Sequence, residues 1–260
     1  MRCGLCLQDV PELVESHIVP KAIMRHNQPQ GGAHPFLVVS TEAHHYVKRS
    51  RTGLYSRIVC PQCERSFQRS DDALLDLLRS LPTATRHTDP QGRPMAMTFP
   101  YANVELIHRG ILTTLFRAHL SQDDSYQKLD VSPFEEPIRQ LLLGTTSTLN
   151  AGFDVVLRVV ETPAGAFTPN PFRQPLDGRD VCTLYFPYVT AYIKLDSQPF
   201  NHVFESVRLR EGSQLLAVWR PEVNKSELEV IRNGVTTHWP TIQKYLVPPP
   251  PHRKRNVPLD

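Results

Sequence analysis

Apolar residues recur with helical spacing in three stretches of the chain. After the cysteine at position 63, one apolar face is formed by Phe67, Leu74, Leu75, Leu78 and Leu81. Residues 103–120 repeat this spacing, and residues 133–143 do so with a proline at position 137, which fits the first turn of a helix. The pattern therefore predicts three helices, of which the second is the most apolar.

Other stretches carry the short apolar runs that are typical of strands. In the second half, residues 153–160, 181–195 and 215–219 are rich in β-branched and aromatic side chains. Shorter apolar pieces in the first half predict strands at residues 13–19, 36–40 and 55–59, with a short helix at 21–25 after Pro20. Helices and strands are mixed throughout, so the predicted fold class is α+β.

Polar residues and prolines divide this pattern into parts. The stretch from Pro82 to Pro94 ends the first long helix, so we expect an N-terminal module over residues 1–88 and a larger α+β domain over residues 95–247. Residues 248–260 contain a run of four prolines followed by His-Arg-Lys-Arg, which predicts an extended basic tail.

Composition limits where such a protein works. No apolar run approaches the roughly 20 residues of a membrane helix, and no apolar segment at the start resembles a signal peptide, so we expect a cytoplasmic protein without membrane partners. The net charge is +3, with a pI near 8.6. A mildly basic chain is compatible with nucleic-acid binding.

Cysteine spacing gives the strongest chemical signal. Four of the five cysteines form two Cys-x-x-Cys pairs, Cys3-Gly4-Leu5-Cys6 and Cys60-Pro61-Gln62-Cys63. Four thiolates complete the tetrahedral shell of a structural zinc ion, and reduced thiols in the cytoplasm favour this use. Two redox dithiols are the alternative, although neither pair lies in a thioredoxin-like βαβ pattern. The fifth cysteine, Cys182, lies in a predicted strand and is expected in the core.

Between the two cysteine pairs lies Ser16-His17-Ile18-Val19-Pro20-Lys21, and the second pair continues as Cys63-Glu64-Arg65-Ser66-Phe67. These motifs resemble those of the HNH endonucleases with a ββα-metal core, in particular a bacterial subgroup with Ser-His-Ile-x-Pro-Lys. The resemblance is specific over residues 3–78. It implies a zinc-stabilised ββα-metal module that hydrolyses DNA phosphodiester bonds, with a role in restriction or defence. Double-strand cleavage by a nuclease with a single site would favour a homodimer.

The resemblance assigns the general base to His17, since an imidazole titrates near neutral pH and can take a proton from water. It also implies a catalytic Mg²⁺ or Mn²⁺ ion that is separate from the zinc, because four thiolates leave zinc no open position. The simpler interpretation of His17 is a buried histidine that satisfies backbone groups.

The ligands of the catalytic ion are less regular. HNH enzymes commonly have an acidic residue where this chain has Ser16, an asparagine where it offers Tyr55 and Arg57, and asparagine or histidine where it has Glu64. Glu64 supplies the hard oxygen that such ions prefer, so it is the expected ligand. A carboxylate favoured by the helix dipole is the alternative.

Asp71 is the second acidic candidate, matching an acidic position of the subgroup, with a solvated helix residue as its alternative. Seven residues along a helix rise about 10 Å, so Glu64 and Asp71 are not expected to bind one ion directly. The remaining candidates are loop histidines and cations that could contact phosphates: His26, His44, His45, Lys48, Arg49, Arg51 and Arg57.

Two functional hypotheses follow. The first is an HNH-type endonuclease that uses His17, Glu64 and Asp71. The second is a non-catalytic zinc module that binds nucleic acid or a protein, which the altered positions at Ser16 and Tyr55 favour.

Overall fold

The structure is a computed structural model in which ten stretches of the chain are described. These are residues 1–26, 36–38, 48–50, 53–99, 102–126, 129–149, 151–160, 170–176, 178–212 and 215–219. The predicted tail at 248–260, His44, His45 and Arg51 lie outside them, and the side chains of Lys48 and Arg49 are not described. Among the described helices, none combines the length and apolar character that crossing a bilayer requires.

The first part of the chain forms a small antiparallel sheet followed by a helix. Strand β1 (Val14–His17) pairs with β4 (Tyr55–Val59), and the register sets His17 opposite Tyr55 and Ser16 opposite Ser56. Between them, α1 (Lys21–His26) follows Pro20, and β2 (Phe36–Val38) pairs with β3 (Lys48–Ser50). The predicted strands at 36–40 and 55–59 and the short helix are confirmed, whereas β3 forms in a stretch with no strand pattern.

Helix α2 (Pro61–Ser80) begins directly after β4. Proline at the first helical position has its φ already set for a helix, and Glu64 in the first turn interacts favourably with the helix dipole. The predicted apolar face is confirmed, since Phe67, Leu74, Leu75 and Leu78 are buried. The helix ends at a 3₁₀ turn, η1 (Leu81–Thr83), which contains Pro82.

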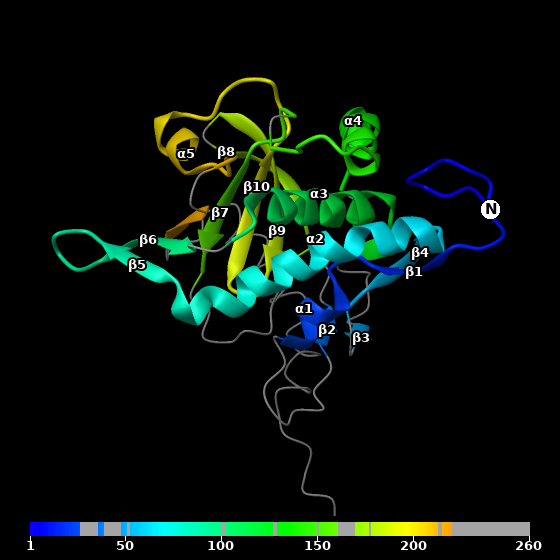
Figure 1. Cartoon of the computed structure of the whole chain (residues 1–260), viewed down its shortest axis with the longest axis horizontal. Helices are drawn as coiled ribbons and strands as arrows, with labels where there is room; N and C mark the ends of the chain where they lie inside the picture. Colours follow the sequence, from blue (N-terminus) through cyan, green and yellow to red (C-terminus); the bar gives the residue numbers. More distant parts are fainter. Residues whose placement is uncertain are drawn as a thin grey trace, which may run out of the picture.

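Helix α3 (Val104–Leu120) lies between α2 and the large sheet (Figure 1). Its Asn103 cap accepts a hydrogen bond of 3.0 Å from the backbone N–H of Leu106. Gly110 lets the helices approach closely, because a Cβ there would lie 2.7 Å from the carbonyl oxygen of Ser70 on α2. Most residues of α3 are buried, in agreement with its sequence being the most apolar of the three helices.

Helix α4 (Ser132–Leu143) forms as predicted and packs against α3, although Pro137 lies elsewhere in the helix than expected. Pro133 occupies the first turn, while Pro137 lies inside the helix. A proline there donates no backbone hydrogen bond, so one rung of the helical ladder is missing. Two short helices complete the described set: η2 (Asp124–Tyr126) and α5 (His202–Val207).

The large sheet has seven described strands in the order β5-β6-β11-β7-β10-β9-β8. All described neighbours pair antiparallel except β11 and β7, which run parallel. The strands are β5 (Thr85–Thr88), β6 (Pro94–Phe99), β7 (Val155–Val159), β8 (Phe172–Leu176), β9 (Arg179–Phe186), β10 (Val189–Lys194) and β11 (Leu215–Trp219). The fold is therefore mixed α+β, as predicted.

Three details of this sheet differ from the sequence pattern. The run at 181–195 divides into β9 and β10, because the chain turns at Tyr188, which has a φ of 62°. Strand β8 was not predicted. The polar stretch 82–94, expected between two domains, ends α2 as predicted but then forms the β5–β6 hairpin that projects from the sheet (Figure 1).

One hydrophobic cluster runs through most of the described chain. It joins buried residues of the cysteine-rich part, such as Ile18 and Val59, with α3 and with the inward side of β7, β9 and β10. Cys182 is fully buried in this cluster, as expected. The division into residues 1–88, 95–247 and 248–260 stays a prediction.

Candidate functional site

Four cysteines converge at one end of the small sheet. The Sγ atoms of Cys3, Cys6, Cys60 and Cys63 all lie within 4.8 Å of one another, and three of the four residues are buried. Sulfur atoms around a tetrahedral zinc ion, with Zn–S bonds near 2.3 Å, lie about 3.8 Å apart. The donor set therefore fits one metal ion and is consistent with structural zinc.

Local backbone geometry explains why the two pairs meet. The first pair lies in a tight turn in which Leu7 has a φ of 58° and the N–H of Cys3 donates to the carbonyl oxygen of Gln8. Gly4 donates a 2.8 Å hydrogen bond to Ile58 on β4, which fixes this turn beside the strand that leads to Cys60. The N–H of Cys60 then donates to the sulfur of Cys3 at 3.3 Å.

The electrostatics of the cysteines favour a cation among them. Burial opposes ionisation of Cys3, but backbone N–H groups of Cys6, Cys60 and Leu5 outweigh it and lower its pKa to about 7. Burial raises the pKa of Cys6 and of Cys63. A metal ion would stabilise all four thiolates together. Two independent redox dithiols give no reason for four sulfur atoms to converge on one point.

A second polar cluster lies beside the cysteines, where β1, α2 and α3 meet. Ser16 is fully buried at the end of β1, and its hydroxyl donates a 2.6 Å hydrogen bond to Glu64 Oε2. Glu64 is in the first turn of α2, directly after Cys63. Its other oxygen, Oε1, lies 3.5 Å from Nη2 of Arg117, which comes from α3.

Asp71 lies two turns further along α2 and belongs to the same cluster. Nη1 and Nη2 of Arg117 donate to its two carboxylate oxygens at 3.1 and 2.9 Å. The Arg117 guanidinium also lies over the Phe67 ring, 4.6 Å from the ring centroid. Burial raises the pKa of Asp71 above the usual aspartate value, and Arg117 opposes that shift. Asp71 is thus a paired, largely buried carboxyl group rather than a solvated helix residue.

His17 is half-buried at the end of β1. Its ring centroid lies 5.7 Å from that of Tyr55, the residue opposite it on β4. Burial and the positive charge of Lys21 lower the pKa of His17 below 6.5, and the negative charges of Glu64 and Glu15 oppose this. The imidazole is therefore predominantly neutral at pH 7 and able to accept a proton.

The predicted site residues thus divide into those that the structure brings together and those that it leaves apart on the surface. The structure brings together the four cysteines, and beside them Ser16, Glu64 and Asp71, with His17 close enough to be affected by the charge of Glu64. His26 is exposed on α1, and Arg57 forms an exposed 3.7 Å ion pair with Glu15.

The residue that sequence reasoning missed is Arg117. It is fully buried, and it lies on α3, far in sequence from the motifs. The available signal was an arginine between Phe116 and Ala118 inside the most apolar helical stretch of the chain. Such an arginine needs a buried acidic partner, and only the structure shows that the partners are Asp71 and Glu64.

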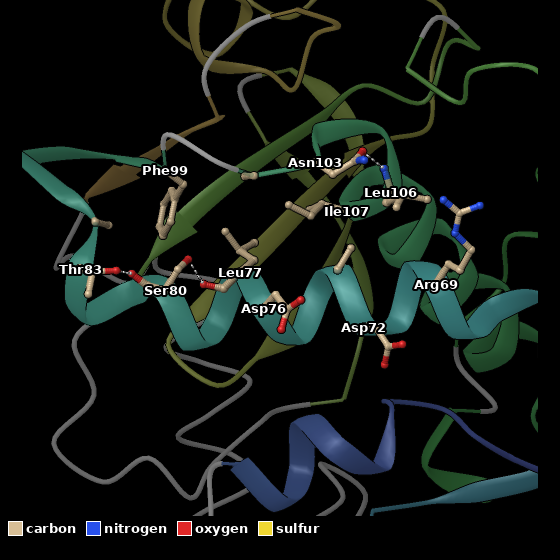
Figure 2. Close-up of a pocket in the computed structure, with 13 residues that line it drawn as sticks. Arg69, Asp72, Asp76, Leu77, Ser80, Thr83, Phe99, Asn103, Leu106 and Ile107 are labelled. Atoms are coloured by element: carbon tan, nitrogen blue, oxygen red, sulfur yellow. Dashed lines mark hydrogen bonds between the residues drawn. The ribbon is translucent and has the colours of Figure 1, made fainter.

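The structure also contains a cavity of about 610 Å³ on another side of α2. Figure 2 shows Arg69, Asp72 and Asp76 along its α2 rim, with Leu77, Phe99 and Ile107 also lining it, next to the Asn103 cap of α3. None of the predicted site residues lines this cavity.

No protein family, curated protein or solved structure matches this chain. The likeness to HNH endonucleases consequently remains an expectation carried by the sequence motifs. The function has to be argued from the chemistry of the two adjoining clusters.

Proposed function

We propose that this chain is a metal-dependent endonuclease of the HNH type that hydrolyses DNA phosphodiester bonds, with His17 as general base. The observation that carries the proposal is the position of His17. It ends β1 beside a cysteine cluster suited to zinc, and its charge environment includes Glu64, which directly follows the last of those cysteines. A strand pair followed by a helix is also the element order that the ββα-metal resemblance implies.

Within this proposal each residue has a separate task. His17 accepts the proton of the attacking water, which its lowered pKa permits at neutral pH. Lys21, exposed at the start of α1, attracts the phosphate backbone. The four cysteines hold a structural zinc that keeps β1 and α2 together.

Glu64 is the proposed protein ligand of a Mg²⁺ or Mn²⁺ ion. Its carboxylate is partly exposed and is oriented by Ser16, so it can present oxygen to a hard cation. Such an ion, when bound, stabilises the negative charge that develops on the phosphate. Action in restriction or defence fits this activity, and double-strand cleavage would favour a homodimer.

The test is plasmid cleavage by the purified full chain in Mg²⁺ and in Mn²⁺. We expect His17→Ala to lower the rate by roughly 100-fold or more, because general-base catalysis contributes that much. His26→Ala is the matched control, since His26 is an exposed histidine on the neighbouring helix α1. Cleavage that persists undiminished in His17→Ala would rule out the assigned base.

The second candidate is a zinc module that binds nucleic acid or a protein without catalysis. One observation favours it: both acidic candidates are already paired with an internal cation, Arg117. Binding of DNA without cleavage in any divalent metal would support this candidate against the nuclease.

A further inference from the structure

The contacts of Arg117 are unequal for its two acidic partners. Asp71 accepts from both terminal nitrogens, at 3.1 and 2.9 Å, which is the strong two-pronged geometry of an arginine–carboxylate pair. Glu64 has a single contact of 3.5 Å with the same guanidinium, and it accepts its short bond of 2.6 Å from Ser16 instead. The charge of Arg117 is therefore directed mainly at Asp71.

The exposed fractions of the side chains also show that Asp71 is the more buried partner of Arg117. The side chain of Arg117 is 1% exposed and that of Asp71 is 18% exposed, whereas Glu64 is 29% exposed. Asp71 and Glu64 are separated by seven residues of α2, a rise of about 10 Å. The guanidinium contacts both carboxylates through its Nη2 atom, which lies 3.5 Å from Glu64 Oε1 and 2.9 Å from Asp71 Oδ2.

We infer that Asp71 is a positioning residue: by pairing with Arg117, it keeps that guanidinium from capturing Glu64. The inference deepens the proposed function, because it concerns the carboxylate assigned to the catalytic ion. Without Asp71, the buried cation has one remaining acidic partner among the described residues, Glu64. Arg117 and Glu64 would then pair directly with each other. A divalent cation at Glu64 would have to displace the guanidinium and would be repelled by its positive charge.

The same contacts assign a role to α3. Arg117 joins the first turns of α2 to a helix whose sequence lies outside the predicted N-terminal module of residues 1–88. Glu64 is therefore held by Ser16 from β1 on one side and restrained through α3 on the other. The candidate site is assembled from both parts of the chain.

A double-mutant cycle tests whether Asp71 acts through Arg117. The variants are Asp71→Asn, Arg117→Met and the double variant, with Glu64→Gln as the reference for loss of the ligand. Methionine preserves apolar contact with Phe67. Binding of Mn²⁺ to the zinc-loaded full chain is measured from the decrease of the free Mn²⁺ signal in electron paramagnetic resonance, and zinc content reports folding.

We expect Asp71→Asn alone to weaken Mn²⁺ binding by about 10- to 100-fold, as other residues that orient a ligand do. In the Arg117→Met background the same substitution should change the affinity by less than about threefold, because the competing cation is gone. An equal loss in both backgrounds would overturn the inference and make Asp71 a ligand.

A crystal structure of zinc-loaded Asp71→Asn gives a readout that needs neither Mn²⁺ nor cleavage. The inference predicts that Arg117 moves to Glu64 and forms hydrogen bonds of about 2.9 Å with it. If the distance between Arg117 and Glu64 stays at 3.5 Å or more in this variant, the inference is overturned. This result can be obtained even if Arg117→Met does not fold. If wild type neither binds Mn²⁺ nor cleaves DNA, the proposed function fails, while the crystal structure still decides the role of Asp71.

Discussion

Arg139 on α4 donates a 3.2 Å hydrogen bond to the backbone carbonyl oxygen of Leu5, which lies between the cysteines of the first pair. The arginine is nearly buried, and its remaining nitrogens bind Glu136. A charged side chain from the later part of the chain thus restrains the turn that presents Cys3 and Cys6.

This restraint should be measurable as metal retention. We expect Arg139→Met to bind zinc about tenfold more weakly, since a hydrogen bond from a charged group contributes roughly 1.5–3 kcal/mol. The measurement is competition with a chromophoric chelator. Arg79→Met, which removes an exposed arginine from α2, should retain zinc like wild type. Equal zinc affinity in the two variants would contradict the role of Arg139.

Removal of the metal should destabilise the fold. Metal analysis of the purified chain is expected to find about one zinc per chain, and Cys63→Ser should lose it and unfold at a lower temperature. Cys182→Ala is the control, because Cys182 lies on β9 and is not one of the four cysteines whose sulfur atoms converge, so this variant should keep its zinc. A folded, reduced wild type without bound zinc would refute the zinc assignment.

Gly110→Ala should separate α2 from α3. The added Cβ would lie 2.7 Å from the carbonyl oxygen of Ser70, which is backbone and cannot rotate away. Overpacking of this kind costs about 1–3 kcal/mol, measured as the free energy of unfolding in urea. Gly92→Ala provides the comparison, because a Cβ there meets nothing within 4 Å and only its left-handed backbone is strained. A smaller loss at Gly110 than at Gly92 would contradict the close crossing.

Stability should fall in mild acid because of His108. This histidine is buried on α3, with Nε2 2.7 Å from the carbonyl oxygen of Phe153 and Nδ1 2.8 Å from the Thr148 hydroxyl. Burial lowers its pKa below 6.5, so the unfolded chain binds the proton first as the pH falls. The stabilisation is complete above about pH 6.5 and is lost below it, by at most about 1.4 kcal/mol per pH unit.

The comparison is urea unfolding at pH 7.5 and 5.5, with zinc in excess, for wild type and His108→Gln. The glutamine variant should lose less stability between the two values, since it removes the group that takes up the proton. Identical slopes for the two proteins would show that other groups cause the acid sensitivity.

The pH profile of cleavage should report on His17. Because burial and Lys21 lower its pKa, the rate should rise with pH through an inflection below 6.5 and stay level above it. Lys21→Met removes one of the causes of this lowering, so its inflection should move to higher pH. An inflection that is unchanged in this variant would separate His17 from the rate-limiting proton transfer.

Sequence patterns predicted the features that depend on local spacing. The apolar period identified α2, α3 and α4, and the paired Cys-x-x-Cys motifs identified the four residues that converge. Strands β5 and β8 were missed for a physical reason: Thr85–Thr88 is wholly exposed, and Phe172–Leu176 contains a proline, so neither shows the expected alternation.

Local sequence patterns could not predict contacts between residues that are far apart in the sequence. The partner of Asp71 is 46 positions away on α3, and no local pattern relates the two. The expectation from the helical rise that Glu64 and Asp71 do not bind one ion directly stays a prediction, and that rise could not show an arginine in contact with both.

The hydrogen bond between Cys60 and Cys3 spans 57 positions of sequence, so the metal centre closes a long loop. During synthesis, the first cysteine pair has to wait for more than fifty further residues before its partners emerge. The complete four-cysteine site therefore cannot form before the second pair has been synthesised, and its formation has to close this loop. Because the entropy of loop closure rises by only about 0.6 kcal/mol for each doubling of length, the chain between the two pairs can gain residues at little thermodynamic expense. The same centre can thus accommodate very different insertions over evolution.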